Sequence, residues 1–490
     1  MKVIVQVARH IWRVGLLAVV LTAAAHSQTT QESGRISLPS DAEIHQLLTA
    51  RVQALAGQQD GIGIVVGIVG PQGRRIISYG HIDQNDSRLV DGDTQFEIGS
   101  ITKVFTALLL ADMVRTHEIA LDDPVAKYVP PDDKIPQPNG RPITLVDLAT
   151  HTSGLPFMPA ESPTPNGFDN PNHDTAQFYR FLAQYNPTRG TGWDYSNLGY
   201  WLLSECLASR GGMEYESLLR TRVLVPLKLT STTFTPSPKT KADLAVGHNA
   251  VLQPSQPFAS APAYGSMAAA GGLVSSVNDL LTFLSATMGY EDSPLTPAMA
   301  VMLNTRRPIG EPGEEQALGW RISGHGDDAL IFHDGATWGF ASDMAWDPRI
   351  RVGIVVLSNQ LEDVSDIARH LLRPEFPLAK PVPMIRRTEI EVAPALLDSY
   401  VGQYQVAGEG TFDVARTGEF LTIRFPDDWG LPQLRLHPDA IADFFSTELL
   451  LRVRFQTSTD GRVTGLLLDP PRGQHTIVAN RVGKRNADLR

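Results

Sequence analysis

The chain of 490 residues contains one cysteine, Cys206, so it cannot form an internal disulfide. Cys206 lies in an apolar segment, Trp201 to Leu207, whose pattern is typical of a buried helix face. A catalytic thiol is therefore not expected there. The 13 histidines show no His-x-x-x-His spacing, and a single cysteine excludes Cys-x-x-Cys. We predict that the protein has no metal site and needs no cofactor.

Positive charge is also scarce. The formal net charge is −11 and Lys and Arg form no cluster, which argues against binding to a nucleic-acid backbone. Neither a Gly-x-Ser-x-Gly nucleophile elbow nor a Gly-x-x-x-x-Gly-Lys phosphate loop occurs. The partner we expect is instead a small-molecule or peptide substrate, and the sequence leaves the oligomeric state open.

Long apolar runs are absent, and the longest near the start spans twelve residues, Val14 to Ala25. A membrane-spanning helix needs about 18 or more. Lys2, Arg9 and Arg13 precede this run, and Ala25-His26-Ser27 follows it with small residues. This pattern predicts a signal peptide over residues 1–27 and a periplasmic or secreted protein, with an uncleaved anchor as the alternative. After cleavage no integral membrane span is expected.

The length and the 42% hydrophobic content predict a globular protein of two domains. Residues 40–372 mix helical and strand patterns, including a helix over 41–56, a hairpin over 63–79, a helix over 100–114 and a capped helix over 279–288. Residues 373–390 form a Pro-rich linker. Short alternating strands with Gly turns then predict an all-β domain over 391–490.

Ser100 and Lys103 are the first residues that indicate chemistry. Three positions apart on a helix, their side chains share one face. A lysine whose pKa is lowered by burial can take the proton from a serine hydroxyl, and Lys103 begins an otherwise apolar helix. The alternative is a serine that caps the helix beside a solvated lysine.

Two further motifs carry polar groups. Tyr195-Ser-Asn197 offers a phenol that can move protons and an amide that can hold a substrate, although the same residues also suit a turn. His333-Asp334-Gly335-Ala336 opens a strand, where glycine allows close approach and the next N–H can face an oxyanion. His151, within Thr-His-Thr-Ser-Gly, is interpreted as a structural loop residue.

The order of these motifs resembles the serine β-lactamase and penicillin-binding-protein family, in its class C-like branch of β-lactamases, D,D-carboxypeptidases, D-aminopeptidases and esterases. The resemblance covers about residues 40–370. Five segments carry it: Phe96-Glu-Ile-Gly-Ser-Ile-Thr-Lys-Val-Phe-Thr106, Ile143-Thr-Leu-Val-Asp-Leu-Ala-Thr-His-Thr-Ser-Gly-Leu-Pro156, Tyr195-Ser-Asn-Leu-Gly-Tyr200, Ala270-Gly-Gly-Leu-Val-Ser-Ser276 and His333-Asp-Gly-Ala-Thr-Trp-Gly339.

The resemblance implies an α/β (α+β) fold in which an antiparallel sheet is flanked by helices, with a helical subdomain beside it. Ser100 would form an acyl-enzyme, Lys103 and Tyr195 would share the acid and base work, and Asn197 would contact substrate. His333, Asp334 and Gly335 would line the site, and the N–H groups of Ser100 and Ala336 would form the oxyanion hole. The final domain resembles the lipocalin-like barrel that some members append.

One departure bears on the substrate. Penicillin-recognising members carry a hydroxyl residue where this chain has Asp334. An ionised Asp334 facing the site would repel a substrate carboxylate by on the order of 1 to 4 kcal/mol. Because strands alternate faces, the alternatives are that Asp334 points away from the substrate or pairs with a neighbouring cation. The expected substrate is a D-amino-acid peptide or peptidoglycan-type amide, or a β-lactam, with a small ester as the alternative. A protein of another class, a non-catalytic peptidoglycan-binding or sensing protein, is the rival hypothesis.

Overall fold

The computed structural model describes residues 38–56, 61–158, 175–186, 192–255, 268–408, 410–426, 431, 433–470 and 475–483. The predicted signal peptide, residues 1–27, lies outside them. Within these ranges, no helix is both long and apolar enough to cross a membrane. The described residues divide into one compact unit between 40 and 385 and a second from 386 onward.

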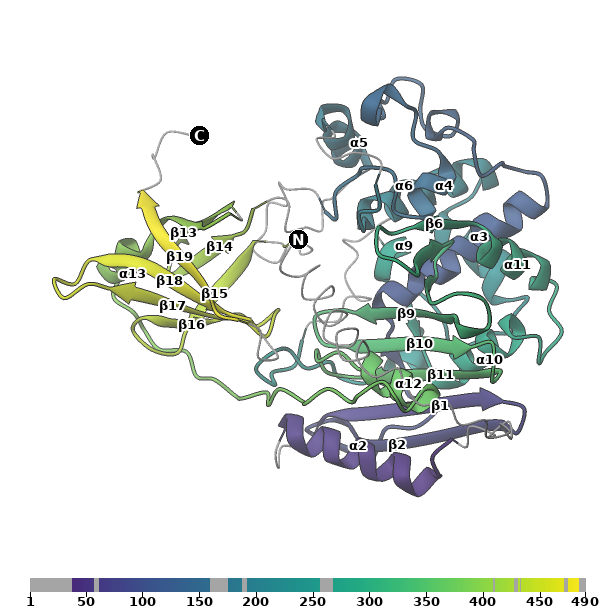
Figure 1. Cartoon of the computed structure of the whole chain (residues 1–490), viewed down its shortest axis with the longest axis horizontal. Helices are drawn as coiled ribbons and strands as arrows, with labels where there is room; N and C mark the ends of the chain where they lie inside the picture. The colour runs from purple at the N-terminus through teal and green to yellow at the C-terminus, as the bar shows by residue number, and fades with distance from the viewer. Residues whose placement is uncertain are drawn as a thin grey trace, which may run out of the picture. The chain divides into compact units, whose positions relative to one another are not determined.

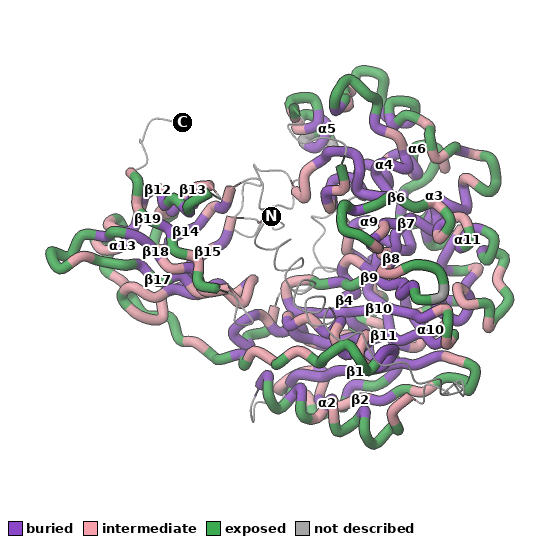
Figure 2. Tube along the Cα trace, viewed as in Figure 1, coloured by how far each residue is buried: buried purple, intermediate pink, exposed green. Residues whose placement is uncertain are grey.

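The first unit is built on a nine-stranded antiparallel sheet (Figure 1) with the order β3-β2-β1-β11-β10-β9-β8-β7-β6. The predicted hairpin is β1 (Gly63–Gly70) and β2 (Gly73–Asp83). The central strands β10 (Ala341–Asp347) and β11 (Val352–Ser358) are buried along their whole length, as Figure 2 shows. The remaining strands are β3 (Asp86–Leu89), β6 (Arg306–Pro308), β7 (Glu314–Ala317), β8 (Arg321–Ser323) and β9 (Leu330–Ala336).

Helices cover both faces of this sheet. On one face, α2 (Asp41–Ala56) packs on the hairpin, where the His45 ring meets Tyr79 edge-on, and the Arg51 guanidinium of α2 pairs with Asp366 of α12 (Ser365–Leu372). On the other face, α10 (Val277–Thr287) lies so close to β1 that a side chain at Gly67 would collide with Val277. The predicted α/β architecture, an antiparallel sheet flanked by helices, is confirmed.

A helical subdomain stands beside the sheet. Its centre is α3 (Thr102–Arg115), which is buried from Thr102 to Met113. Two predicted boundaries were wrong by a few residues. Ser100 lies in a 3₁₀ turn, η1 (Gly99–Ile101), ahead of α3, and the helix predicted from Asp279 begins at Val277 because Ser276 caps it. The other elements of this unit that matter below are α4 (Leu145–Ala149), α6 (Asn197–Gly211) and α9 (Ala268–Gly271).

The second unit is a closed barrel of eight antiparallel strands, as the sequence predicts for a lipocalin-like domain. Helix α13 (Pro394–Tyr400) precedes it. Aromatic side chains fill the interior: Tyr400 stacks on Phe455 at 4.2 Å between ring centroids, and Tyr404, Phe412 and Phe444 are fully buried. The strands are β12 (Gly402–Val406), β13 (Gly410–Thr417), β14 (Phe420–Arg424), β15 (Leu434–Pro438), β16 (Asp443–Phe445), β17 (Arg452–Thr457), β18 (Val463–Asp469) and β19 (Ile477–Gly483).

Asp343, in the middle of β10, is an unusual core residue. It is 0% exposed, and neither carboxyl oxygen has a hydrogen-bond partner among the described residues. Burial therefore raises the pKa of Asp343 well above its usual value. The positive charge of Arg369 lowers this pKa, and the negative charges of Asp334, Asp363 and Asp366 raise it further. The folded protein holds a proton on Asp343 at pH values where the unfolded chain has lost it.

Replacing Asp343 with Asn should therefore stabilise the protein at neutral and alkaline pH. The folded state binds the extra proton, so wild-type stability falls as pH rises from the unfolded pKa toward the folded one, whereas Asn does not titrate. We expect a gain on the order of 1 kcal/mol or more at pH 8 and a smaller difference at pH 5. Thermal unfolding of both proteins across this range measures it.

Asp347 on the same strand provides the control. It is equally buried, but its carboxylate accepts a hydrogen bond from Arg373 Nε at 2.8 Å. Asp347→Asn removes one partner of a buried ion pair and should destabilise the protein by about 3–5 kcal/mol. Destabilisation by both substitutions would contradict the assignment of Asp343 as an unpaired acid.

Candidate active site

Ser100 lies at the junction between the sheet and the helical subdomain. It is the middle residue of η1, is partly exposed, and comes one helical turn before Lys103. The turn depends on Gly99, whose φ of +48° disfavours other residues and whose added Cβ would lie 2.5 Å from the nitrogen of Ala336. Glycine at this position thus lets η1 pack directly against the end of β9.

The Lys103 side chain is 0% exposed and reaches three oxygen atoms. Its Nζ lies 3.1 Å from Ser100 Oγ, 2.7 Å from Asn197 Oδ1 and 2.6 Å from the carbonyl of Ala270 in α9. Burial lowers the pKa of the Lys103 ammonium well below its ordinary value, and the charge of Asp334 acts in the opposite direction. The predicted serine–lysine pair is therefore in contact, with the lysine shielded from water.

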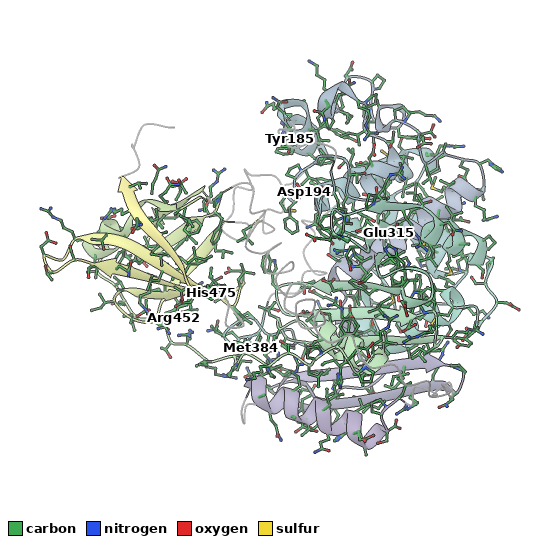
Figure 3. All side chains as sticks on the ribbon, in the orientation of Figure 1. Tyr185, Asp194, Glu315, Met384, Arg452 and His475 are labelled. Atoms are coloured by element: carbon green, nitrogen blue, oxygen red, sulfur yellow. The ribbon has the colours of Figure 1, made fainter. Side chains whose placement is uncertain are left out.

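Tyr195 lies in the loop that leads into α6, and Asn197 is the first residue of that helix. Asp194, labelled in Figure 3, precedes Tyr195, and the side chain of Ser196 caps the helix by accepting from the N–H of Gly199 at 2.9 Å. Lys103 Nζ lies 4.8 Å from the centroid of the Tyr195 ring. Desolvation raises the pKa of the Tyr195 phenol well above its ordinary value, while a hydrogen-bonding interaction with Ser100 opposes this. The cap thus fixes both side chains beside Lys103.

Strand β9 brings the third motif to the same place. His333 is 3% exposed, and its ring centroid is 6.5 Å from that of Tyr195. Burial lowers the pKa of His333 to about 4, so its imidazole is neutral at pH 7. Gly335 lies against the serine turn, where an added Cβ would be 2.2 Å from the carbonyl of Ile98 and 3.0 Å from the nitrogen of Ser100. Any larger residue would push β9 away from Ser100.

The backbone N–H of Ala336 points toward the open edge of β9. Thr337 N donates to the carbonyl of Phe340 at 3.0 Å and closes the hairpin, so the next pair, Ala336 and Ala341, is of the non-hydrogen-bonded type. The N–H of Ala336 therefore faces away from β10. On that side, β8 pairs with β9 only as far as Phe332.

Asp334 occupies the opposite face of β9 from His333 and Gly335, because successive residues of a strand alternate. It pairs with Asp343 of β10, on the face that α12 covers, and its side chain is exposed. The charge of Asp334 still acts on Lys103, His333 and Tyr195. The sequence motif predicted that Asp334 lies near the site, but it did not establish towards which face of the strand its side chain points.

Three further groups at the site were missed from the sequence. The carbonyl of Ala270 gave no signal, because any residue supplies one. His151, for which the sequence predicts only a structural role in a loop, stacks on Tyr195 with 4.3 Å between ring centroids. Arg321 begins β8 and lies over the ring of Trp193 at 5.0 Å, forming an ion pair with Glu314 at 3.9 Å. Only contacts across the fold distinguish Arg321 from the chain's other arginines.

No group of three or more metal-ligating side chains occurs in the part of the chain that the structure describes. The arrangement itself is suited to acyl transfer. A partly exposed hydroxyl lies beside a buried amine, and the Tyr195 phenol and the backbone of Ala336 lie close to the same turn.

Known proteins are similar to this chain in sequence. The sequence model of the Beta-lactamase family matches residues 48–374. The chain is 29% identical over 311 residues to the D-alanyl-D-alanine-carboxypeptidase/endopeptidase AmpH of Escherichia coli (strain K12), covering 60% of this chain and 78% of that protein. It is 27% identical over 359 residues to a beta-lactamase of Pseudomonas fluorescens, covering 65% of this chain and 94% of that protein.

Solved structures agree on the fold. A class C beta-lactamase from Rhodobacter sphaeroides superposes with a TM-score of 0.58 at 24% identity, covering 69% of this chain and 98% of that one. The fold and the similarities therefore define a class, the serine hydrolases that include β-lactamases and D,D-peptidases. Within it, the chain belongs to the beta-lactamase family.

Proposed function

We propose that the protein is a serine hydrolase in which Ser100 attacks an amide or ester carbonyl and forms an acyl-enzyme. One observation carries the proposal: the fully buried Nζ of Lys103 lies 3.1 Å from the hydroxyl oxygen of Ser100. A buried lysine without a nearby carboxylate contact is costly to maintain, and its lowered pKa suits it to proton abstraction. Membership of the beta-lactamase family supports the same chemistry.

The number of N–H groups on Lys103 supports its assignment as the base. A neutral amine has two N–H groups and one lone pair. The two shorter contacts, to Asn197 and Ala270, use both N–H groups, which leaves the lone pair for the Ser100 hydroxyl proton. The raised pKa of Tyr195 keeps its phenol protonated, so it can donate to a leaving group.

Each step then conserves protons. The Ser100 proton moves to Lys103 Nζ as Oγ bonds to the substrate carbonyl carbon, and the N–H groups of Ser100 and Ala336 stabilise the resulting oxyanion. The leaving nitrogen or oxygen departs with a proton from Tyr195, which regains one from Lys103. Water then attacks the acyl-enzyme and gives a proton to Lys103. The bond between the acyl carbon and Oγ breaks, and Lys103 returns this proton to Oγ, which releases the acid and free Ser100.

We propose a D-amino-acid peptide of the peptidoglycan type, or a β-lactam, as the substrate. The names of two relatives, a D-alanyl-D-alanine-carboxypeptidase/endopeptidase and a beta-lactamase, support this class. His333, Gly335 and Asn197 would line the binding site. A small ester is the second candidate, favoured by the charge of Asp334, which acts on the site from the opposite face of β9 and opposes a substrate carboxylate. The predicted export to the periplasm or medium suits either substrate.

Mass spectrometry of the purified protein tests the proposal. The protein is incubated with a fluorescent penicillin and, separately, with p-nitrophenyl acetate, and the peptide that carries Ser100 is examined for an added acyl group. A penicilloyl adduct there supports peptidoglycan or β-lactam chemistry, and ester turnover without it moves the substrate to esters. No adduct and no turnover with either probe would support the non-catalytic binding protein instead.

Neutralising Asp334 should shift the pH dependence of kcat/KM. Its charge raises the pKa of Lys103, so Asp334→Asn lowers that pKa and makes the amine available as a base at lower pH. A unit charge acting through partly wet protein contributes about 1 kcal/mol. Since Asp334 is exposed and screened by solvent, kcat/KM on the acid side should rise by no more than about fivefold.

Two substrates separate the ways in which Asp334 acts. A rise shared by a D-alanyl-D-alanine peptide and a neutral ester indicates an effect through Lys103. A rise confined to the peptide, which Asp334→Thr should reproduce, indicates direct repulsion of its carboxylate. Asp328→Asn, at another exposed position ahead of β9, is the control and should leave both profiles unchanged. If Asp334→Asn does the same, Asp334 has no part in the site.

A further inference from the structure

Tyr195 has no regular secondary structure of its own to fix it, because it precedes the first residue of α6. The residues on either side are both bonded to His151. The N–H of Asp194 donates to the His151 carbonyl at 2.8 Å, and the N–H of Ser196 donates to His151 Nδ1 at 3.1 Å. One residue, distant in sequence, therefore holds the backbone before and after Tyr195.

The ring of His151 makes a third contact. It stacks on the Tyr195 phenol with 4.3 Å between ring centroids and 27° between ring planes. Its centroid also lies 5.2 Å from that of the Tyr200 ring. His151 is 1% exposed. The imidazole therefore fills buried space against the phenol, close enough to Lys103 for the charge of the lysine to act on it.

The backbone of His151 is itself strained. Its φ is +58°, a value that non-glycine residues adopt rarely and at a cost of about 1 kcal/mol or more. The strain directs its carbonyl and its ring toward the same loop. Strained residues of this kind persist where surrounding contacts over-determine them, and the three contacts with the Tyr195 loop are such contacts.

The hydrogen bond to Ser196 also fixes the charge of His151. Nδ1 accepts a hydrogen bond from the N–H of Ser196, so the neutral ring carries its own proton on Nε2. A protonated His151 ring could not accept this hydrogen bond. It would also be a buried positive charge close to Lys103, His333 and Arg321, each of which disfavours it. Burial and these three groups lower the pKa of His151 well below its ordinary value, so the imidazole stays neutral.

From this geometry we propose that His151 is a positioning residue, which holds Tyr195 in register with Lys103 and Ser100 by clamping the backbone on both sides and stacking on the phenol. The proposal rests on the proposed function, since Tyr195 must move protons for its position to matter. His151 touches no reacting atom.

Two substitutions separate the clamp from the ring. His151→Phe keeps a flat ring and loses the acceptor for Ser196. His151→Asn keeps a side-chain acceptor, suits a positive φ and loses the ring. His45→Asn is the matched control, because His45 also packs against a tyrosine, Tyr79, with ring centroids 5.6 Å apart on α2.

The clamp consists of the hydrogen bonds from the N–H groups of Asp194 and Ser196 to His151. Hydrogen exchange measured at single amides tests these bonds without any substrate. In His151→Phe the Ser196 amide should exchange at least about tenfold faster, while the Asp194 amide, which bonds to a backbone carbonyl, stays protected. In His151→Asn and His45→Asn both amides should remain protected. An unchanged Ser196 rate in His151→Phe would overturn the clamp.

The pH dependence of kcat/KM tests the role of the His151 ring. Losing it admits water beside Lys103 and raises the lysine pKa toward its ordinary value, so the acid limb of kcat/KM should move to higher pH in His151→Asn. His151→Phe should keep the limb in place and lose about tenfold in kcat/KM. If both variants keep the wild-type value of kcat/KM and the wild-type position of its acid limb, the positioning role of His151 is wrong. A wild-type protein without turnover would instead defeat the proposed function, while the exchange rates still decide the clamp.

Discussion

Ser100→Ala should reduce hydrolysis of every substrate to the level of the control without enzyme, a loss of at least about 10⁴-fold. The nucleophile is the one atom for which no neighbouring group can substitute. Lys103 is fully buried and Tyr195 lies over it, so neither offers a replacement oxygen or nitrogen to the substrate. Steady-state rates with a β-lactam, a D-alanyl peptide and an ester measure the loss.

The fold should survive this change. Ser100 is only partly buried, and its side chain meets only Lys103 Nζ and the Tyr195 phenol among the interactions described above. The unfolding free energy should therefore change by less than about 1 kcal/mol. Ser87→Ala, at an exposed serine of edge strand β3, is the control and should keep full activity. Turnover by Ser100→Ala at more than a few per cent of wild type would rule out Ser100 as the nucleophile.

Much of the fold was predictable because its signals are local. Helix α2 has the predicted bounds, and the hairpin of β1 and β2 follows from two apolar runs around Pro71-Gln-Gly73. The barrel was predictable from short alternating strands with glycine turns. One of the two wrong boundaries lies where a tertiary contact decides, because Gly99 turns the chain ahead of α3 where β9 packs. The other, at α10, follows the local cap by Ser276.

The site was predictable to the extent that it consists of side chains with distinctive chemistry at short spacing. Ser100 with Lys103, and Tyr195 with Asn197, are two such pairs, and the structure brings them together. His151 carried a signal too, but its meaning depends on a loop 45 residues away along the chain. Asp343 and Arg321 could not be recognised, since a buried acid and a surface acid look alike until the sheet register is known.

Lys103→Met should lower kcat/KM by about 10² to 10⁴-fold and remove the acid limb of the pH profile. The hydroxyl of Ser100 would then have no buried amine to accept its proton, while the nucleophile and the backbone N–H groups remain. The loss should fall mainly on kcat for acylation. Pre-steady-state labelling by a fluorescent penicillin measures this step alone.

Stability complicates this variant, and a second one separates the two effects. The oxygens of Asn197 and Ala270 lose a donor in Lys103→Met, at a cost of about 1–3 kcal/mol for each buried acceptor. Lys103→Gln retains an NH₂ donor for them but cannot act as a base. If the amine is needed as a base, both variants lose the rate and the acid limb, although Lys103→Gln should unfold at a higher temperature. Near-wild-type acylation by a folded Lys103→Gln would assign the base to Tyr195 instead, whose phenol would then have to ionise beside a neutral amide.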